Sequence, residues 1–545
     1  MKVKKWGSMV LTSVLSVTML AACSGGTTKD TSSSPNPAPA GSPSGDASGS
    51  GFPISKDKIT INAFAGKFIS DADWNTIRIW QEYEKMTNVH INWETVQKDN
   101  LKEKRNLMLA GGNYPEIFYA SSFPKADLIK YGKQGAFLPL NDLIDKQMPN
   151  FKKILEKYPS IKKAITMPDG NIYSIPTLFD PEFKSVLYGT PWVKKPWLDK
   201  LQVKEPTNLD EFYAMLKAFK ENDANGNGQK DEIAWGGTGT NGILSYLKGA
   251  YGLNNRGLSN ANVDSDPATG KIRFVPADPK YKELLQYVNK LYNDGLIEKD
   301  IVTVKSSEID AKGMEGKLGI VDNVAPEAIY NQNDYVGLPV LKGPHGDQMN
   351  TAVYSPVWGF GNYVLTDKNK HPEQSARWVD YFFSPEGTKM FFMGWKGETY
   401  NEDASGNVDY VDDIKKNPNG LNLDQAVGRY LIWPGGLYPG FVTQKYFKGA
   451  EGLQSSVDNA KKSEAFSLTQ DKVWPSLNFT AEEQAATGTV QNDINTYVTE
   501  MQDKFIIGQV GFDKWDEYVA TLNKMGLEKY VKTYQTALDR YSSVK

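Results

Sequence analysis

The stretch LKEKRNLMLAGGNYPEIFYA, residues 101–120, holds two hydrophobic patterns separated by a pair of glycines. Across residues 101–110 the apolar side chains recur at the spacing of a helix, and Gly111 with Gly112 ends that pattern. Residues 116–120 then form a short apolar run that is typical of a buried strand. The stretch therefore predicts a helix that leads through a glycine turn into a strand.

The same alternation extends toward the start of the chain. Residues 59–65 form a β-rich run, residues 74–87 show helical periodicity, and residues 89–96 form another strand pattern. Strands that alternate with helices are typical of α/β folds with parallel strands, so we predict an α/β fold. Helical patterns dominate later in the chain, at 210–220, 281–294, 372–383 and 512–541.

The first residues have the form of a secretory signal peptide. Lysines within the first five residues supply positive charge, and an apolar stretch follows over residues 9–22. This stretch is shorter than the roughly 20 residues that a membrane-spanning helix needs. It ends in Leu20-Ala21-Ala22-Cys23, which contains the only cysteine of the chain and is similar to the lipobox of bacterial lipoproteins. That resemblance implies cleavage of a signal peptide over residues 1–22 and a lipid, such as palmitate, on Cys23.

A polar segment follows the cysteine. Residues 24–52 are rich in Ser, Gly and Pro and contain almost no large apolar side chain. Such a composition cannot bury enough surface to offset the entropy lost on ordering. We therefore predict that residues 23–52 form a lipidated, flexible tether, and that folded structure begins at residue 53.

Charge and composition exclude some classes of function. The net charge is −3, with no basic stripe of the kind that nucleic acid requires, so we expect no nucleic-acid partner. The chain contains 13 Trp and 28 Tyr, which suit either a wet binding surface or the core.

No catalytic set is recognisable in the sequence. The three histidines are far apart, and no G-x-S-x-G nucleophile elbow occurs. A G-x-G-x-x-G match at residues 237–242 follows no strong hydrophobic strand pattern, and no βαβ unit is evident around it, so the match alone does not predict dinucleotide binding. Because the chain has 65 acidic residues, a glycoside hydrolase that uses a carboxylate pair stays open as an alternative.

The segment DANGNGQKDE, residues 223–232, begins like an EF-hand calcium loop. Asp223, Asn225 and Asn227 occupy positions 1, 3 and 5, and Gly228 stands at the turn. Position 12, where an EF-hand has a bidentate Glu, is Ala234. A solvated Asn-Gly turn is the alternative interpretation.

An ordered set of segments resembles one protein family. The segments are LMLAGGNYPEIFYA (107–120), GAFLPLNDLID (135–145), DGNIYSIP (169–176), WLDKLQVKEPTNLDEFYAMLKAFK (197–220), EGKLGIV (315–321), PVLKGPHGD (339–347), WVDYFFSPEGTKMFFMGWKGETY (378–400) and FDKWDEYVATLNKMGLEKYVKTYQTALDRY (512–541). In order and spacing they resemble the extracellular solute-binding protein family 1, the large sugar-binding lipoproteins of bacterial ABC importers. The resemblance covers nearly all of the chain beyond the tether.

The resemblance implies a periplasmic-binding-protein-like fold. In that family two α/β lobes are joined by a hinge, and the ligand is held in the cleft between the lobes. We expect residues 53–175 with 305–355 to form the first lobe. Residues 176–304 with 356–545 would form the second lobe, which would also carry the calcium loop.

The resemblance also implies a set of ligand-binding residues. It places Trp358 of SPVWGFGNY, and Trp395, Glu398 and Tyr400 of MGWKGETY, at the cleft. Further aromatic candidates are Trp192, Trp235 and Trp433. Aromatic faces suit the C–H patches of sugar rings, although core packing is the alternative for each of these side chains.

Alginate-binding members of the family close a similar calcium loop at positions 9 and 10. That resemblance implies calcium ligands from the side chains of Asp223, Asn225, Asn227, Asp231 and Glu232, and from the backbone carbonyl of Gln229. Six oxygen donors suit a hard cation. We expect this calcium to be structural.

Together with the lack of a catalytic set, the resemblance implies a non-catalytic receptor on the extracellular face of the cell membrane, held there by its lipid anchor. We expect a monomer that captures a carbohydrate, most simply an oligosaccharide, and delivers it to the permease subunits of an ABC transporter. The alternatives are a surface glycoside hydrolase or lyase, and a sugar-sensing module for a membrane kinase.

Overall fold

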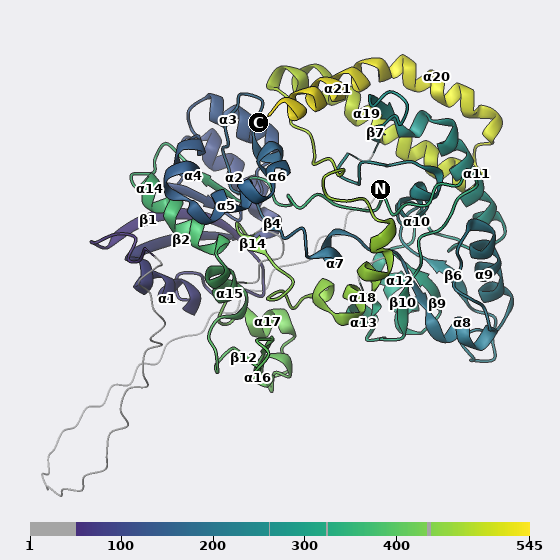
Figure 1. Ribbon diagram of the computed structural model, residues 1–545, viewed down its shortest axis with the longest axis horizontal. Helices are drawn as coiled ribbons and strands as arrows, with labels where there is room; N and C mark the ends of the chain where they lie inside the picture. The colour runs from purple at the N-terminus through teal and green to yellow at the C-terminus, as the bar shows by residue number, and fades with distance from the viewer. Residues whose placement is uncertain (1–50, 261, 323–324, 433–437, 545) are drawn as a thin grey trace, which may run out of the picture. The chain divides into compact units, whose positions relative to one another are not determined.

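The computed structural model describes residues 51–260, 262–322, 325–432 and 438–544 (Figure 1). The expected signal peptide, Cys23, nearly all of the tether and Trp433 lie outside these ranges. The chain divides into two units, residues 1–51 and 52–545, and every helix and strand that the structure describes belongs to the second. Within the described ranges, no helix has both the length and the apolar character needed to cross a bilayer.

The first sheet has the strand order β11-β3-β1-β2. Strands β1 (Ile59–Lys67), β2 (Val89–Gln97) and β3 (Ile117–Tyr119) are parallel, with Ile59 opposite Val89 and Ala63 opposite Ile117. Helix α1 (Arg78–Thr87) connects β1 to β2, and α2 (Leu101–Ala110) leads from β2 to β3. The α/β alternation predicted from residues 101–120 and their surroundings is therefore confirmed, and β11 (Tyr363–Leu365) joins β3 in the antiparallel sense.

The second sheet has the order β10-β5-β9-β6. Strands β6 (Ile233–Gly236) and β9 (Leu318–Val321) are parallel, whereas β5 (Trp192–Lys194) runs antiparallel to both β9 and β10 (Tyr335–Gly337). All four residues of β9 are buried, as expected for an interior strand of a sheet covered on both faces.

The two sheets divide the chain differently from the expected lobe boundaries. We expected residues 305–355 with the first sheet, but β9 and β10 pair within the second sheet. Conversely, β11 and the helices α14 (Pro372–Asp380) and α15 (Pro385–Met393), expected in the second lobe, pack into the core of the first sheet. The reason is long-range pairing, because β3 takes β11 as its edge neighbour while β9 lies between β5 and β6.

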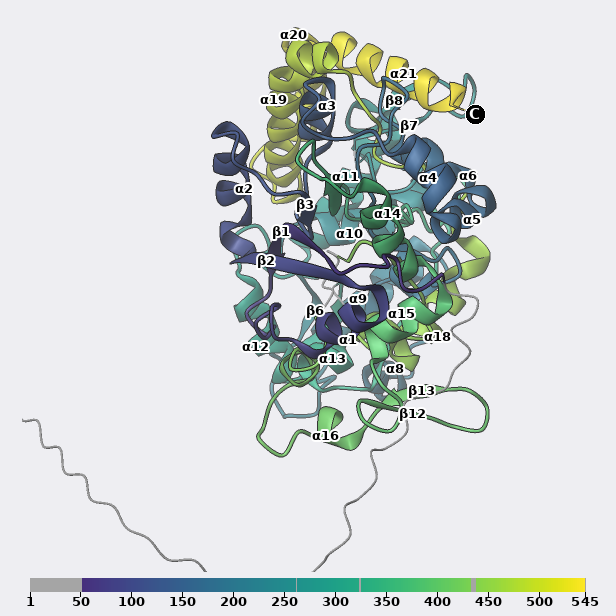
Figure 2. The same cartoon turned by 90° about the vertical axis from the view of Figure 1, so that its left-hand side faces the viewer.

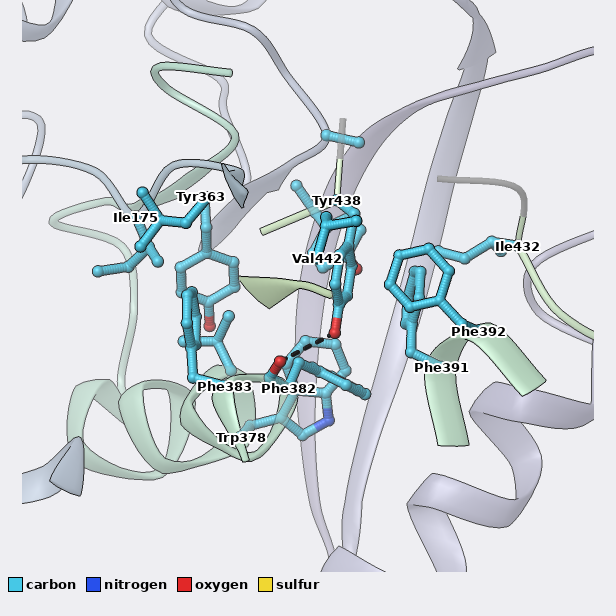
Figure 3. Close-up of a cluster of buried hydrophobic side chains, with 14 of the residues drawn as sticks. Ile175, Tyr363, Trp378, Phe382, Phe383, Phe391, Phe392, Ile432, Tyr438 and Val442 are labelled. Atoms are coloured by element: carbon cyan, nitrogen blue, oxygen red, sulfur yellow. Dashed lines mark hydrogen bonds between the residues drawn. The ribbon is translucent and has the colours of Figure 1, made fainter. Parts of the chain in front are cut away.

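Aromatic side chains fill the core beside the first sheet. Figure 3 shows Tyr363, Trp378, Phe382, Phe391 and Tyr438 gathered from separate segments. The ring of Tyr438 stacks on Phe391 with centroids 3.7 Å apart, and its hydroxyl donates to the carbonyl of Phe382 at 3.0 Å. Much of the aromatic content therefore serves packing, where each buried ring contributes about 1.5–3 kcal/mol.

A helical layer at the C-terminal end of the chain packs against α11 (Pro279–Asn293) (Figures 1 and 2). It consists of α19 (Ala481–Ile506), α20 (Trp515–Met525) and α21 (Leu527–Ser543). Thr480 and Glu483 form a capping box at the start of α19. The single helical pattern predicted at 512–541 is split at Gly526, whose φ of 102° ends one helix and starts the next.

The remaining helices and strands lie around the two sheets or connect them. Around the first sheet lie α3 (Lys125–Lys133), α4 (Asn141–Gln147), α5 (Pro149–Lys157), α6 (Pro159–Ile165), β4 (Leu178–Phe179), β12 (Tyr400–Glu402), β13 (Val408–Tyr410), α16 (Asp412–Lys415), α17 (Leu423–Val427) and β14 (Phe441–Val442). The other elements are α7 (Lys184–Leu187), α8 (Lys195–Leu201), α9 (Leu209–Glu221), α10 (Asn241–Leu247), β7 (Val263–Ser265), β8 (Ile272–Phe274), α12 (Ser306–Met314), α13 (Pro326–Tyr330) and α18 (Gln454–Ser463).

Candidate functional site

The carboxyl ends of β1, β2 and β3 lie at one edge of the first sheet, which is where open α/β sheets bind ligands. Directly after β3, Ala120 and Ser122 have left-handed φ values of 49° and 46°. Non-glycine residues adopt this conformation rarely, and they concentrate at functional sites. Arg105 holds the turn by donating to the carbonyl of Ser121 at 2.6 Å, and Asn362 accepts from the N–H of Ser122 at 3.2 Å.

At the corresponding edge of the second sheet, a carboxyl group follows β9. Asp322 sits against Gly237 and Gly242, and a Cβ added to Gly242 would lie 1.5 Å from its Oδ2. Burial raises the pKa of Asp322 to about 6. The outer glycines of the G-x-G-x-x-G match thus make room for a carboxyl group of the same chain.

Trp358 presents an exposed aromatic face. Its side chain is 47% exposed, and its backbone N–H donates to the carbonyl of Thr177 at 3.0 Å. The ring meets Tyr354 edge-on at 5.6 Å and Phe179 at 6.0 Å. Tyr354 is itself 40% exposed, and sequence reasoning missed it although it lies four residues before Trp358.

Trp395 and Glu398 form a closed cluster with Arg78, the first residue of α1. The Arg78 guanidinium lies 4.1 Å from the centre of the Trp395 ring and donates to both carboxylate oxygens of Glu398, at 2.6 and 3.2 Å. Hydrogen bonding to Arg78 lowers the pKa of Glu398. A ligand at Trp395 would therefore compete with Arg78 for the ring face.

Three further expected aromatic contacts within the described ranges lie in the interior. Tyr400 is 6% exposed and Trp192 is 5% exposed. Trp235 has no exposed surface, and its ring packs beside Phe212 and Tyr246, so the core-packing interpretation applies to it. A ring without an accessible face cannot stack on a sugar, which removes Trp235 from the candidate ligand contacts in this structure.

The calcium-loop candidate connects α9 to β6. Gly226 and Gly228 have φ values of 82° and 81°, which glycine adopts without strain. Asp223 accepts from their N–H groups at 2.8 and 3.2 Å. The amide oxygen of Asn225 accepts from the N–H of Asn227 at 3.0 Å, so side chains and backbone fold the loop on itself.

The two carboxylates that end the loop differ in their surroundings. Asp231 accepts from the side-chain amides of Asn225 and Asn227 at 3.1 and 3.0 Å, and hydrogen bonding from Asn227 lowers its pKa. Glu232 is 1% exposed, and its Oε1 accepts from the N–H of Asn225 at 3.1 Å. Its Oε2 is buried with no hydrogen-bond partner among the residues that the structure describes.

The loop offers the residue types that a calcium ion needs. Carboxylate and amide oxygens are hard donors, and the unpartnered Oε2 of Glu232 leaves negative charge that a cation would neutralise. As they stand, however, no three His, Cys, Asp or Glu side chains converge to hold a metal anywhere in the described ranges. The amides of Asn225 and Asn227 would have to turn their oxygens inward to complete a site.

Comparison with known sequences gives matches over the whole chain. A sequence model of bacterial extracellular solute-binding proteins matches residues 75–389. The fructooligosaccharide ABC transporter substrate-binding protein FusA of Streptococcus pneumoniae serotype 4 is 29% identical over 559 residues, covering 100% of both chains. Lipoprotein LipO of Bacillus subtilis is 26% identical over 341 residues, which are 58% of this chain and 62% of LipO.

Solved structures match the folded part. FusA of S. pneumoniae in complex with kestose aligns with a TM-score of 0.71 at 27% identity, over 89% of this chain and 100% of FusA. A FusA EF-hand mutant in complex with fructo-nystose aligns with a TM-score of 0.70 over the same shares, also at 27% identity. The alginate-binding protein AlgQ2, solved without calcium ion, aligns with a TM-score of 0.63 at 25% identity, over 89% of this chain and 99% of AlgQ2.

Proposed function

The chain belongs to the family of bacterial extracellular solute-binding proteins, and from that premise we propose that it is the oligosaccharide-binding subunit of an ABC importer. Members of this family are non-catalytic transporter components, so the protein is a receptor and not an enzyme. The observation that carries the proposal is the likeness to FusA, which extends over the full length of both sequences and over the fold.

The ligand would bind between two lobes, one built on each sheet. The carboxyl ends of β1–β3 in one lobe, and of β6 and β9 in the other, are the edges where ligands bind in α/β sheets. A ligand that contacts both edges binds the closed arrangement better than the open one and shifts the population toward it. The closed form would then dock on the permease.

Trp358 and Tyr354 are the aromatic platform that we propose for a sugar ring. Both rings are about half exposed, and they meet at an angle of 74°. Of the other expected contacts, Trp395 and Glu398 are proposed as secondary because Arg78 already engages them. Tyr400 and Trp192 are buried, so they would contact a ligand only after local rearrangement and are the weakest of the proposed contacts.

The loop at residues 223–232 would bind one structural calcium ion. The side chains of Asp223, Asn225, Asn227, Asp231 and Glu232 and the carbonyl of Gln229 supply the oxygens, and when bound the ion would neutralise the buried carboxylate of Glu232. Relatives of the chain include one with an EF-hand and one solved in a calcium-free form. The loop lies between α9 and β6, so the ion would fix this corner of the second lobe.

A lipid on Cys23 would hold the receptor, as a monomer, on the extracellular face of the membrane. The likeness to lipoprotein LipO supports this anchor, as does the lipobox-like sequence before Cys23. Cys23→Ala should release the protein into the medium or stop its processing. A variant that stays on the membrane at full yield would contradict the anchor.

Isothermal calorimetry of the mature protein against neutral and acidic oligosaccharides tests the main proposal. We expect at least one oligosaccharide to bind and to raise the melting temperature, because it binds only the native state. Binding of peptides alone would overturn the proposal. New shorter saccharides in the same samples would indicate a hydrolase or lyase, and undiminished uptake of the bound sugar in a deletion strain would indicate sensing.

A further inference from the structure

Three segments far apart in sequence meet along a line that we call the seam, residues 254–258, 351–358 and 470–476. The N–H of Leu258 donates to the carbonyl of Val353 at 3.0 Å, and the N–H of Trp474 donates to the carbonyl of Arg256 at 2.9 Å. The side chain of Gln470 also donates to the carbonyl of Tyr354, at 3.4 Å. Backbone and side-chain bonds therefore hold the three segments side by side.

The seam contains buried polar groups that no described residue satisfies. Both side-chain polar atoms of Asn254 lack a hydrogen-bond partner, although this residue is only 1% exposed and has a φ of 56°. The Nε of Arg256, the hydroxyl of Thr351 and the side-chain oxygen of Gln470 are buried and unpartnered as well. More than nine in ten buried polar groups in proteins have a partner in the chain or in ordered water, so this cluster leaves hydrogen bonds that water or a bound molecule can make.

Aromatic rings accompany these polar groups. The guanidinium of Arg256 lies 5.5 Å from the centre of the Trp474 ring, in the arrangement of a cation–π contact. Tyr354 and Trp358, on the second segment of the seam, are the two exposed rings of the proposed platform. A sugar has hydroxyl groups that form hydrogen bonds and C–H faces that pack on aromatic rings. Polar groups without partners in the same seam as exposed rings therefore suit a sugar ligand.

The charge at the seam is positive and uncompensated. Arg256 has no carboxylate within 4.0 Å in the part of the chain that the structure describes, and the same holds for Lys125, at the start of α3. Lys125 donates to the carbonyl of Ser476 in the seam and lies 3.9 Å from the centre of the Phe360 ring. Burial lowers its pKa to about 7, as expected for an ammonium group without a counter-ion.

We propose that the seam binds a sugar that carries a carboxylate, a uronate residue, with Arg256 as the group that selects it. This inference rests on the proposed function and specifies its ligand. A guanidinium forms two parallel hydrogen bonds to a carboxylate, which an ammonium group cannot match in geometry. The C–H face of the sugar ring would lie on Trp358.

A neutral sugar fits the seam less well. Covering the Arg256 guanidinium with an uncharged ligand would remove water from a cation without supplying an opposite charge, which costs free energy. A carboxylate supplies that charge, and its hydrogen bonds with Arg256 are of the stronger, charge-assisted kind. The same geometry therefore favours an acidic oligosaccharide over its neutral counterpart.

Calorimetry on the full mature protein tests this with three probes: tri-galacturonate, its fully methyl-esterified form, and kestose. We expect the acid to bind at least tenfold more tightly than its methyl ester, with an affinity that falls as salt rises. Arg256→Gln should lose at least tenfold in affinity for the acid and less than threefold for the ester. Arg256→Lys keeps the charge but loses the paired geometry, so it should retain part of the preference.

The control is Lys217→Gln, which removes one positive charge from an exposed side chain of α9 and should change neither affinity. Equal binding of acid and ester, or binding of kestose alone, overturns the uronate inference and leaves the proposed function standing. An Arg256→Gln variant that binds the acid as tightly as the wild type also overturns the uronate inference and leaves the proposed function standing. Failure of every oligosaccharide to bind overturns the proposed function as well. The wild-type comparison decides the question even if Arg256→Gln does not fold.

Discussion

Oε1 of Glu232 accepts the backbone N–H of Asn225 at 3.1 Å, while its Oε2 is buried without a partner. One carboxylate thus closes the loop between α9 and β6 and leaves half of its hydrogen-bonding capacity unused. A buried, unneutralised carboxylate oxygen destabilises a fold unless a proton or a cation satisfies it. This relationship is the physical basis for the calcium proposal.

Calcium should raise the melting temperature of the wild type. A ligand at a hundred times its Kd stabilises the native state by about 2.7 kcal/mol. Thermal unfolding in calcium and in EGTA should therefore differ, and Asp223→Ala combined with Asp231→Ala should remove the difference. Asp266→Ala is the control, because Asp266 also closes an exposed turn by accepting from Ala268 and Thr269. A wild type that is indifferent to EGTA and carries no calcium by elemental analysis would contradict the site.

Trp358 and Trp235 should respond to truncation in opposite ways. Trp358→Ala removes an exposed ring, so it should weaken oligosaccharide binding by about tenfold or more with little change in stability. Trp235→Ala removes a ring from the core and should lower the free energy of unfolding by about 3–5 kcal/mol. Calorimetric titration and urea unfolding of both variants check this. Unchanged affinity of Trp358→Ala for the oligosaccharide would mean that the sugar ring does not stack on Trp358.

Asp322 should make stability depend on pH. Its pKa is about 6 in the folded protein, against an ordinary value of 3.8, so the folded state holds the proton more tightly than the unfolded state does. The stabilisation is then fully present below about pH 4 and is lost as pH rises through 6. The difference between the two pKa values corresponds to at most about 3 kcal/mol.

Asp322→Asn should remove this contribution. Relative to the wild type, the variant should gain stability as pH rises from 4 to 7, measured as the difference in urea midpoints at each pH. Asp380, whose pKa burial also raises to about 6, is present in both proteins and cancels from the comparison. Parallel pH profiles for the two proteins would show that the Asp322 carboxyl titrates normally.

Local elements were predictable from the sequence because their signals are local. The helix expected at residues 101–110 matches α2, and the strand expected at 89–96 matches β2 to within one residue. The lobe boundaries were not predictable in this way. The sheet that β9 or β11 joins is decided by pairing with strands more than a hundred residues away in the sequence. No local sequence pattern predicts that pairing.

The candidate site was predictable only in part, for a related reason. Trp235 and Trp358 are alike as residue types, and only the packing of Phe212 and Tyr246 around the first separates core from surface. The loop at 223–232 was easier to predict because the residues that supply its oxygen atoms are close together in the sequence. Arg256 carried no signal at all, since its distinguishing feature is a missing partner on segments that meet only in three dimensions.

Gly242 and Asp322 should be coupled in stability. A Cβ on Gly242 would lie 1.5 Å from Oδ2 and 2.9 Å from Cβ of Asp322, so Gly242→Ala must displace that side chain or the start of α10. Overpacking of this kind costs about 1–3 kcal/mol. In an Asp322→Gly background the three nearest atoms are gone, and the same substitution should cost much less. A double-mutant cycle by urea unfolding measures the coupling, which we expect to exceed about 1 kcal/mol. Additive effects would mean that the cost of Gly242→Ala arises from the helix backbone and not from the carboxyl group that the glycine accommodates.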